Sequence, residues 1–372
     1  MRIAYLDHVP DLAEPADLAP HAAVTGRTTA GAGLVLRPYA ILRADGESVR
    51  VGRNGFFGER ATSHIAHGVL GAKMGDDVTV GRFGLVHACT LGDGVVVADG
   101  ASVTDGAVVG AYSLIAPGAL VPPRKALAGG YVYEGHPATP TREIGRDELA
   151  AIARAIREGR PSALGTSGDL PPLDTVPFIP EGPFEGVLHA IHGCAPRLAR
   201  SYVAPTAILV GDVELHDDAG VYFACVLAAG GARIVVGEAT NVQDNTLIVT
   251  DAHRGDTILG KRVTIGHNVR MGSGRFGDDA LVGMASKVGD GVIVEPGGCI
   301  GAGAHVEPGT VVKAGWIWAG RPARAFRAVK DAEREWFAEG ARTYVEYSRE
   351  YRGNQGQSAI YSMQSQAGRS ST

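Results

Sequence analysis

Residues 97–121 read VADGASVTDGAVVGAYSLIAPGALV, and a small aliphatic residue recurs at every sixth position of this stretch. The aliphatic positions are Val97, Val103, Val109, Ile115 and Val121, and mainly Gly, Ala, Asp, Pro and Ser lie between them. A period of six matches neither the 3.6 of a helix nor the 2 of an ordinary strand. The spacing predicts a parallel β-helix, in which each short strand forms one wall of a triangular coil and points its aliphatic side chain inward.

The same spacing returns in the second half of the chain, at Val282, Val288, Val294, Ile300, Val306 and Val312. Residues 78–94 (VTVGRFGLVHACTLGDG) and 263–279 (VTIGHNVRMGSGRFGDD) are two copies of one segment, separated by 185 positions. Identical residues keep that offset without a gap, as in the pairs Pro20/Pro205, Gly52/Gly237, Gly81/Gly266, Asp105/Asp290 and Gly135/Gly320. We therefore predict a β-class chain with two tandem left-handed parallel β-helix domains, each followed by a C-terminal α-helix.

Composition and periodicity divide the chain into four parts. Segments of helical character at 147–158 and 331–351 follow the two β-helices and should pack back along the coils. A Pro- and Gly-rich stretch between the copies is typical of a linker, and the polar C-terminal end is typical of a disordered tail. The predicted parts are a first domain at 1–158, a linker at 159–183, a second domain at 184–353 and a tail at 354–372.

Composition also argues against several classes of protein. A net charge of −5 over 372 residues provides no basic field for nucleic acid. The four cysteines have no CxxC spacing, which argues against a zinc knuckle, a redox pair or a disulfide framework. The N-terminal sequence MRIAYLDHVPDLAEP lacks the features of a signal peptide, and no stretch approaches the ~18 apolar residues of a membrane span. We expect a soluble protein of the cytoplasm that does not associate with a membrane.

Both copies resemble γ-class carbonic anhydrases over nearly their whole length. The likeness rests on the six-residue repeat, the segments TNVQDN and VTIGHN, the exit segments YVYEGHPAT at 131–139 and WIWAGRPAR at 316–324, and a tyrosine-bearing final helix. The family builds a trimer whose zinc sites lie between subunits: one subunit gives the first and third histidines, and its neighbour gives the second. The resemblance therefore implies a homo-oligomer and a metal site between domains.

The three ligand positions of the family are divided between the two copies. In the first copy the three positions hold His64, Arg82 and His87. In the second copy they hold Val249, His267 and Gly272, in the same order. The first copy keeps the two histidines that one subunit donates, and the second keeps the histidine that a neighbour donates. One orientation of a contact between the copies brings His64 and His87 against His267. The resemblance thus implies one composite zinc site, and a cation at Arg82 would disfavour metal in the other orientation.

Other functional positions of the family are divided in a similar way. Arg43 and Asp45 survive only in the first copy, where an ion pair that stabilises an interface is the simpler interpretation of these two residues. Gln243 and Tyr344 survive only in the second copy. By resemblance, Gln243 would orient the metal-bound water and Tyr344 would lie near the cavity. Asn241 and Asp244 flank Gln243, and we interpret both as turn residues that satisfy backbone groups.

Three neutral imidazoles leave zinc with an open fourth position for water, and the metal lowers the pKa of that water to about 7. The resulting hydroxide can attack CO2 or another activated carbonyl. Ferrous iron or cobalt suits the same three-histidine site. The sequence therefore predicts a zinc-dependent, carbonic anhydrase-like lyase that acts on a small molecule, either CO2 and bicarbonate or a larger carbonyl compound.

Three alternatives remain open at this point. Phe56 and Phe57, if they face the groove, would favour a repurposed hydratase, dehydratase or hydrolase acting on a larger organic substrate. A hexapeptide acyltransferase also uses grooves between coils. The third alternative is a non-catalytic assembly subunit whose sites have decayed. Among the other histidines, we expect His67 to lie outside the ligand set or on the surface, and His253 has at most a minor place in the groove.

Overall fold

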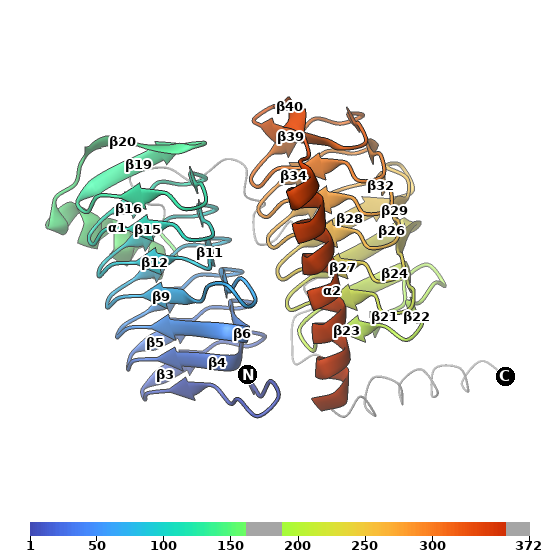
Figure 1. Cartoon of the computed structure of the whole chain (residues 1–372). Helices are drawn as coiled ribbons and strands as arrows, with labels where there is room; N and C mark the ends of the chain where they lie inside the picture. Colours follow the sequence, from blue (N-terminus) through green and yellow to red (C-terminus); the bar gives the residue numbers. More distant parts are fainter. Residues whose placement is uncertain (161–187, 355–372) are drawn as a thin grey trace.

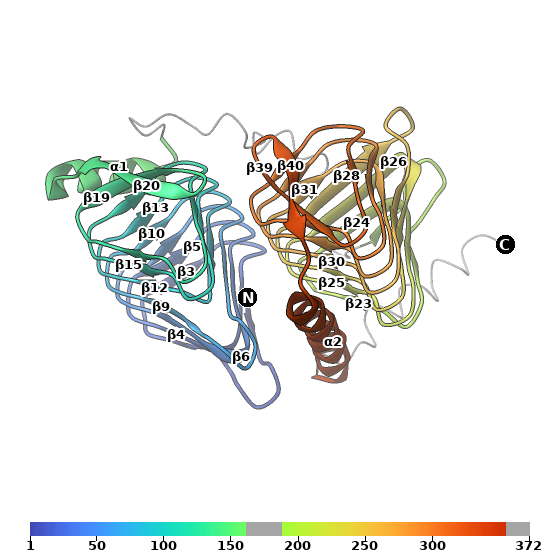
Figure 2. The same ribbon diagram turned by 45° about the horizontal axis from the view of Figure 1, so that its top comes forward.

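The computed structural model describes residues 1–160 and 188–354. Two β-helices lie side by side, and both rise in the same direction from their N-terminal coils (Figure 1). Helix α2 (Asp331–Asn354) runs down the molecule where the two β-helices approach each other (Figures 1 and 2). The chain therefore holds two parallel solenoids with one long helix at their junction.

The first β-helix contains twenty short strands followed by one helix. They are β1 (Arg2–Ile3), β2 (Asp11–Leu12), β3 (Ala16–Leu18), β4 (Ala23–Ala30), β5 (Leu34–Leu36), β6 (Ile41–Val51), β7 (Phe56–Phe57), β8 (Thr62–His64), β9 (Ala72–Met74), β10 (Thr79–Val80), β11 (Leu85–His87), β12 (Thr90–Leu91), β13 (Val96–Val97), β14 (Ser102–Val103), β15 (Val108–Val109), β16 (Leu114–Ile115), β17 (Leu120–Val121), β18 (Ala126–Leu127), β19 (Tyr131–Gly135), β20 (Ala138–Glu143) and α1 (Arg146–Arg157).

The described part of the second β-helix repeats this order and ends in α2. Its strands are β21 (Leu188–His189), β22 (Arg197–Leu198), β23 (Tyr202–Val203), β24 (Ile208–Leu215), β25 (Gly220–Val221), β26 (Val226–Val236), β27 (Asn241–Val242), β28 (Leu247–Asp251), β29 (Thr257–Leu259), β30 (Thr264–Ile265), β31 (Arg270–Met271), β32 (Gly274–Phe276), β33 (Leu281–Val282), β34 (Lys287–Val288), β35 (Val292–Val294), β36 (Cys299–Ile300), β37 (His305–Val306), β38 (Val311–Val312), β39 (Trp316–Gly320) and β40 (Ala323–Ala328).

Each β-helix has three walls although its strands form two sheets. In the first copy one sheet has the order β20-β19-β16-β13-β10-β7-β5-β3 and forms one wall. The long strand β6 pairs with β8 through its first half and with β9 through its second half, so the other sheet bends into the remaining two walls. Strand β26 pairs in the same way with β28 and β29 in the second copy.

The six-residue repeat becomes a stack of aliphatic side chains inside the coils. In the parallel register Val97 lies opposite Ile115, and Val103 lies opposite Val121. These four residues and Val109 are at most 1% exposed and belong to one hydrophobic core. Three six-residue steps make one coil, so each wall receives one aliphatic residue per coil. The corners pass through the left-handed region of φ, at Gly106 (φ +69°) but also at Asn268 (φ +57°).

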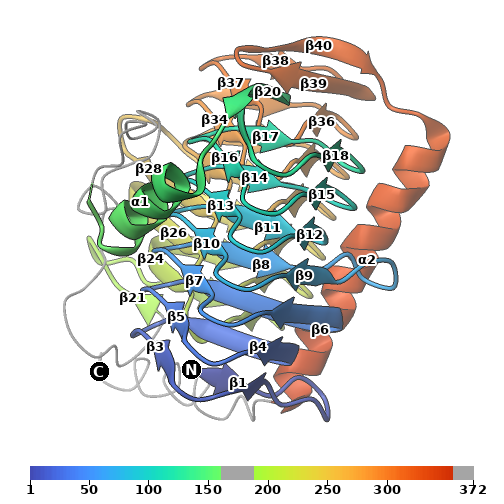
Figure 3. The same ribbon diagram turned by 90° about the vertical axis from the view of Figure 1, so that its left-hand side faces the viewer.

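The two helices pack on their own β-helices in different ways. Helix α1 has Asp147 and Glu148 in its first turn, which suits the positive end of the helix dipole. It buries Leu149 and Ile152 in a cluster with strand residues such as Leu114. Figure 3 shows α1 and α2 on opposite sides of the first β-helix. Helix α1 therefore covers an outer wall of its own copy and stays away from the junction.

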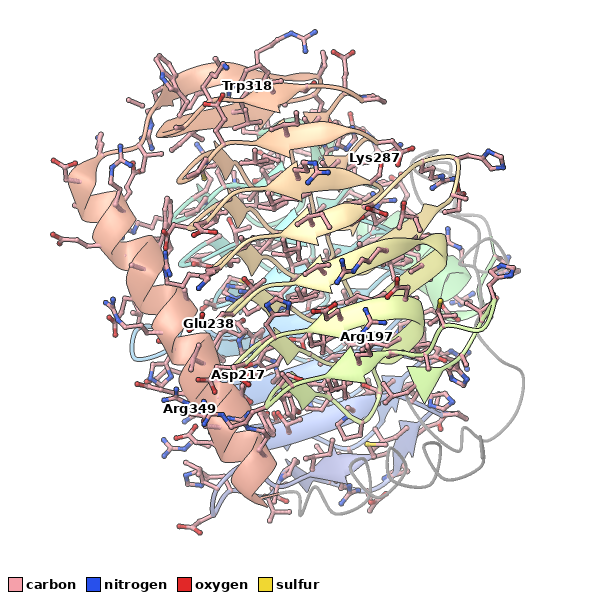
Figure 4. All side chains as sticks on the ribbon, turned by 90° about the vertical axis from the view of Figure 1, so that its right-hand side faces the viewer. Arg197, Asp217, Glu238, Lys287, Trp318 and Arg349 are labelled. Carbon is pink, nitrogen blue, oxygen red and sulfur yellow. The ribbon has the colours of Figure 1, made fainter. Side chains whose placement is uncertain are left out.

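Helix α2 contacts both copies. Arg349 lies on the outer side of α2 beside the first coils of the second copy (Figure 4), and its Nη2 donates to Oδ2 of Asp218 over 2.7 Å. Tyr344, Tyr347 and Tyr351 all make contacts with the first copy, described below. This helix covers the junction between the copies.

The predicted fold class is confirmed: two tandem left-handed parallel β-helices are each followed by a helix. Apart from their edge residues, the predicted linker at 159–183 and tail at 354–372 lie outside the described residues. Neither α1 nor α2 has the length and apolar character that a membrane-spanning helix needs.

Candidate metal centre

The two copies meet along a buried polar seam. Arg43 of the first copy donates from Nε to Oδ2 of Asp244 in the second copy over 2.7 Å, and both side chains are fully buried. Arg60 donates from Nη1 to Oδ1 of Asn245 over 3.3 Å, and these residues hold the same position in the two copies, 185 residues apart. Equivalent positions therefore touch near the centre of the seam.

The three histidines from the two copies come together at this seam. His64 ends β8 and His87 ends β11, and the parallel register places these two residues directly opposite each other. His267 follows β30 of the second copy, in the corner turn. One ligand atom from each of the three histidines lies within 4.8 Å of the others. Of the two orientations of contact between the copies, the chain adopts the one that assembles His64, His87 and His267.

Burial keeps two of these imidazoles neutral. The exposed fractions of His64, His87 and His267 are 2%, 7% and 1%. Burial, and then the charge of Arg43, hold the pKa of His64 well below its ordinary value. Burial lowers the pKa of His267 to about 4, against the opposing effect of Asp244. Neutral imidazoles are the form that binds a metal ion.

Each histidine has a neighbour at Nδ1. Nδ1 of His64 lies 2.9 Å from the backbone oxygen of Arg43, and Nδ1 of His87 lies 2.5 Å from Oδ1 of Asp105. Nδ1 of His267 is 3.2 Å from Oδ2 of Asp244, but the two groups lack the alignment of a hydrogen bond. These neighbours favour the tautomer that leaves Nε2 as the electron-pair donor in His64 and His87.

Arg43 connects the histidines, the seam and α2. Its Nη2 lies 3.0 Å from Nε2 of His64 and donates to Oη of Tyr344 over 3.0 Å. Its Nη1 pairs with Asp45, which also accepts a hydrogen bond from Tyr351. A metal bound through Nε2 of His64 would replace the contact between that atom and Arg43.

Tyr344 lies at the histidine cluster, as its place on the final helix suggested. Its Oη is 3.2 Å from Nε2 of His267. Burial raises the pKa of Tyr344 above its ordinary value, so the phenol stays protonated. Gln243 is also buried, but its Nε2 donates to Oδ1 of Asn241 over 3.0 Å, and no contact with the three histidines is recorded among the described residues. The structure thus places Arg43 and Tyr344 in contact with the histidines, and Asp45 in contact with Arg43. Gln243 contacts Asn241 instead.

Several other sequence interpretations are altered by the structure. Phe57 is fully buried in the core of the first copy, and Phe56 lies between the guanidinium groups of Arg37 and Arg157. Neither phenylalanine lines a groove, so the argument that they favour a larger organic substrate is wrong. Asp244 is more than a turn residue, since its Oδ1 accepts from a backbone N–H while its Oδ2 contacts Arg43 and His267.

The remaining histidines lie outside the cluster. His67 is exposed, and its Nδ1 lies 2.7 Å from Oη of Tyr347 on α2. His253 lies in an exposed turn. A separate surface hollow is lined by Arg197, Asp217, Glu238 and neighbouring residues (Figure 4), and none of its lining residues belongs to the histidine cluster.

Sequence reasoning missed Asp105 and the tyrosines Tyr347 and Tyr351. The available signal for Asp105 was its retention, with Asp290, at the offset of the duplication. Retention alone does not show whether an aspartate closes a corner of the coil or hydrogen-bonds a histidine. The two tyrosines follow Tyr344 on one face of α2, which an analysis of the helix by its 3.6-residue period would have shown.

The residues at the seam fit a metal ion. Three buried imidazoles converge, and such a donor set suits zinc, iron or cobalt. The carboxylates of Asp105 and Asp244 stand behind two of the imidazoles, an arrangement that orients metal ligands in proteins.

Two curated relatives each match less than half of this chain. γ-Carbonic anhydrase 2, a mitochondrial protein of Arabidopsis thaliana, is 33% identical over 149 residues, which are 39% of this chain and 54% of the relative. The chain thus spans about half the length of that relative. Protein YrdA of Escherichia coli (strain K12) is 34% identical over 180 residues, which are 46% of this chain and 98% of the relative.

Among solved structures, a hexapeptide transferase family protein from Anaplasma phagocytophilum is 37% identical. The match covers 44% of this chain and 98% of that protein, with a TM-score of 0.43. No family model matches the chain.

Proposed function

Because the chain belongs to the γ-carbonic anhydrase-like family of hexapeptide-repeat proteins, we propose that it is a metal-dependent lyase with one centre per chain. His64, His87 and His267 would hold the metal, with zinc as the first candidate and iron or cobalt as alternatives. The observation that carries the proposal is the approach of these three ligand positions, which come from two copies, to within 4.8 Å of one another.

A bound zinc ion would supply Lewis-acid activation of water at near-neutral pH. The protein supplies the remaining conditions. Burial keeps His64 and His267 neutral, so both can act as ligands without first losing a proton. The buried hydroxyl of Tyr344, which accepts a hydrogen bond from Arg43, stands beside the cluster and can hold a proton donor or acceptor in a fixed place.

The burial of the cluster favours a small substrate. All three histidines are at most 7% exposed, and α2 covers the junction where they lie. Hydration of CO2 to bicarbonate and a proton requires room for only a few atoms. We therefore propose CO2 and bicarbonate as the substrate pair in preference to a larger carbonyl compound. The centre forms within one chain, so its assembly does not depend on oligomerisation.

Three of the predicted site residues have supporting roles in this proposal. Arg43 and Asp45 would hold the seam and the hydroxyl of Tyr344 in place, as their buried contacts indicate. Gln243 is proposed to orient the reacting water, with Asn241 fixing its amide nitrogen. The two copies that together form the centre would correspond to the domains 1–158 and 184–353.

Elemental analysis combined with stopped-flow CO2 hydration tests the proposal. We expect close to one metal ion per chain, and hydration that is lost when the metal is removed and regained when zinc is restored. The His267→Ala variant should lose both metal and activity, and the exposed His253→Ala variant should keep both. Full metal content in His267→Ala would overturn the composite centre. Consumption of an acyl donor by the wild-type protein, without CO2 hydration, would favour the acyltransferase alternative.

A further inference from the structure

Asp105 lies at a corner of the first β-helix, two residues after β14, the strand that stacks on β11 in the next coil (Figure 3). Its backbone is fixed from both sides. The N–H of Gly106 donates to the oxygen of Ala88, and the N–H of Arg124 donates to the oxygen of Asp105. These two hydrogen bonds fix the position of Asp105 beside the end of β11, where His87 lies.

Aspartates at such corners have a common role in this protein. In five cases the carboxylate accepts the backbone N–H of the residue 17 positions earlier, over 2.8–3.0 Å. The accepting residues are Asp93, Asp99, Asp217, Asp278 and Asp290. This contact closes one coil onto the next and explains why aspartate is frequent at the corners.

Asp105 departs from that role. The N–H that the pattern would assign to it belongs to Ala88, and this group donates to the oxygen of His64 instead. The carboxylate of Asp105 turns to Nδ1 of His87 over 2.5 Å.

The second copy contains the matched comparison. Asp290 occupies the position equivalent to Asp105, but Gly272 stands where the first copy has His87. There the carboxylate keeps the ordinary corner contact, with the N–H of Ser273 over 3.0 Å. A Cβ at position 272 would collide with Oδ1 of Asp290. The same aspartate therefore has two orientations, and the one seen in the first copy occurs where a histidine ligand is present.

We infer that Asp105 is a positioning residue for His87, which it holds with the proton on Nδ1 and Nε2 free toward His64 and His267. The effect of Asp105 on metal binding rests on the proposed metal centre, but the tautomer of His87 can be measured in the metal-free chain. Second-layer carboxylates of this kind typically change metal affinity 10- to 100-fold.

The test uses the full chain with Asp105→Ala, Asp105→Asn and the matched control Asp290→Ala. Zinc affinity is measured by competition with a chelator, and the tautomer of His87 is read from ¹⁵N chemical shifts of the metal-free protein at pH 8. We expect Asp105→Ala to bind zinc about 10- to 100-fold more weakly and to lose the uniform Nδ1–H tautomer. Asp105→Asn, which keeps an acceptor but not the charge, should retain the tautomer with an intermediate affinity.

The control separates positioning from a structural role. Asp290→Ala should unfold at a lower temperature but bind zinc nearly as tightly as the wild type, since its carboxylate contacts Ser273 and the exposed Arg254 rather than a ligand of the cluster. Wild-type affinity and an unchanged His87 tautomer in Asp105→Ala would overturn the inference. If the wild-type protein binds no zinc, the proposed function fails, and the tautomer measurement still decides whether Asp105 controls His87.

Discussion

Arg43 of the first copy and Asp244 of the second form an ion pair of 2.7 Å in which neither side chain is exposed to solvent. The second copy has Ala228 at the position equivalent to Arg43, and the first has Glu59 at the position equivalent to Asp244. The ion pair therefore exists in only one orientation of the two copies, the orientation that also assembles the three histidines. Such a pair specifies how the copies meet more than it stabilises them, because desolvation offsets most of its attraction.

Breaking this pair from one side should destabilise the protein strongly. Arg43→Met would leave Asp45 and Asp244 buried without their cation, and loss of one member of a buried pair typically costs about 3–5 kcal/mol. Urea unfolding of the metal-free protein at pH 7.5 measures this change. The surface pair of Arg53 and Asp76 is the control, and Arg53→Met should change the stability far less than Arg43→Met, because water screens this pair. Equal effects of the two substitutions would contradict the role assigned to the seam.

Metal content should follow the three histidines together. A site with two imidazoles lacks the ligand number of stable zinc binding, so His64→Ala, His87→Ala and His267→Ala should each reduce occupancy from about one ion per chain to well below one tenth. Elemental analysis after dialysis against a weak chelator gives the occupancy. His67→Ala is the control, since His67 contacts Tyr347 outside the cluster and should leave the metal in place. More than one tightly bound ion per wild-type chain would contradict a single centre.

Acid should destabilise the metal-free protein before most carboxylates are protonated. The pKa of His267 is about 4 in the folded protein against an ordinary value of 6.5, and that of His64 is also lowered. Between these values the unfolded chain binds a proton that the folded chain does not, so stability is full above pH 6.5 and falls toward pH 4. His267 alone should account for about 3 kcal/mol of this loss.

Urea midpoints of the metal-free protein from pH 7.5 to 4.5 measure this dependence. His267→Gln removes the titrating group and should flatten the curve. A curve that is as steep in His267→Gln as in the wild type would assign the acid sensitivity to other groups.

The fold was predictable because it depends on a local repeat. The aliphatic residues from Val97 to Val121 report directly on the inside of the coils, and each occupies the core position that the repeat implies. The approach of the three histidines was predictable for a related reason. Because the duplication has no gaps, each position of one copy has a single equivalent in the other, and the family pattern then selects His64, His87 and His267.

The partners of the histidines were not predictable in the same way. Asp105 and Asp290 are the same residue type at the same corner, but the carboxylate turns to His87 in the first copy and to the N–H of Ser273 in the second, where Gly272 replaces the histidine. Phe56 was misinterpreted because its surroundings include Arg157 on α1, a contact between segments far apart in sequence. Periodicity reports which face a residue occupies, and tertiary packing decides what covers that face.

Tyr344→Phe tests the role of the helix that covers the seam. The substitution removes the hydroxyl that accepts from Arg43 over 3.0 Å and lies 3.2 Å from Nε2 of His267, while the ring can keep its packing against Tyr222. Because a hydrogen bond to a charged group contributes about 1.5–3 kcal/mol, we expect kcat for CO2 hydration to fall about 10- to 100-fold. Metal content should be unchanged, since the three imidazoles remain.

Tyr347→Phe provides the matched comparison on the same helix. Its hydroxyl contacts the exposed His67 rather than the cluster, so kcat should stay within about threefold of the wild type. Stopped-flow hydration and elemental analysis on the same preparations separate an effect on the reaction from an effect on metal binding. If Tyr344→Phe loses its metal, the hydroxyl supports the ligands through His267 and Arg43. If both metal and kcat are unchanged, α2 covers the seam without taking part in the reaction, and the proposed role of Tyr344 is wrong.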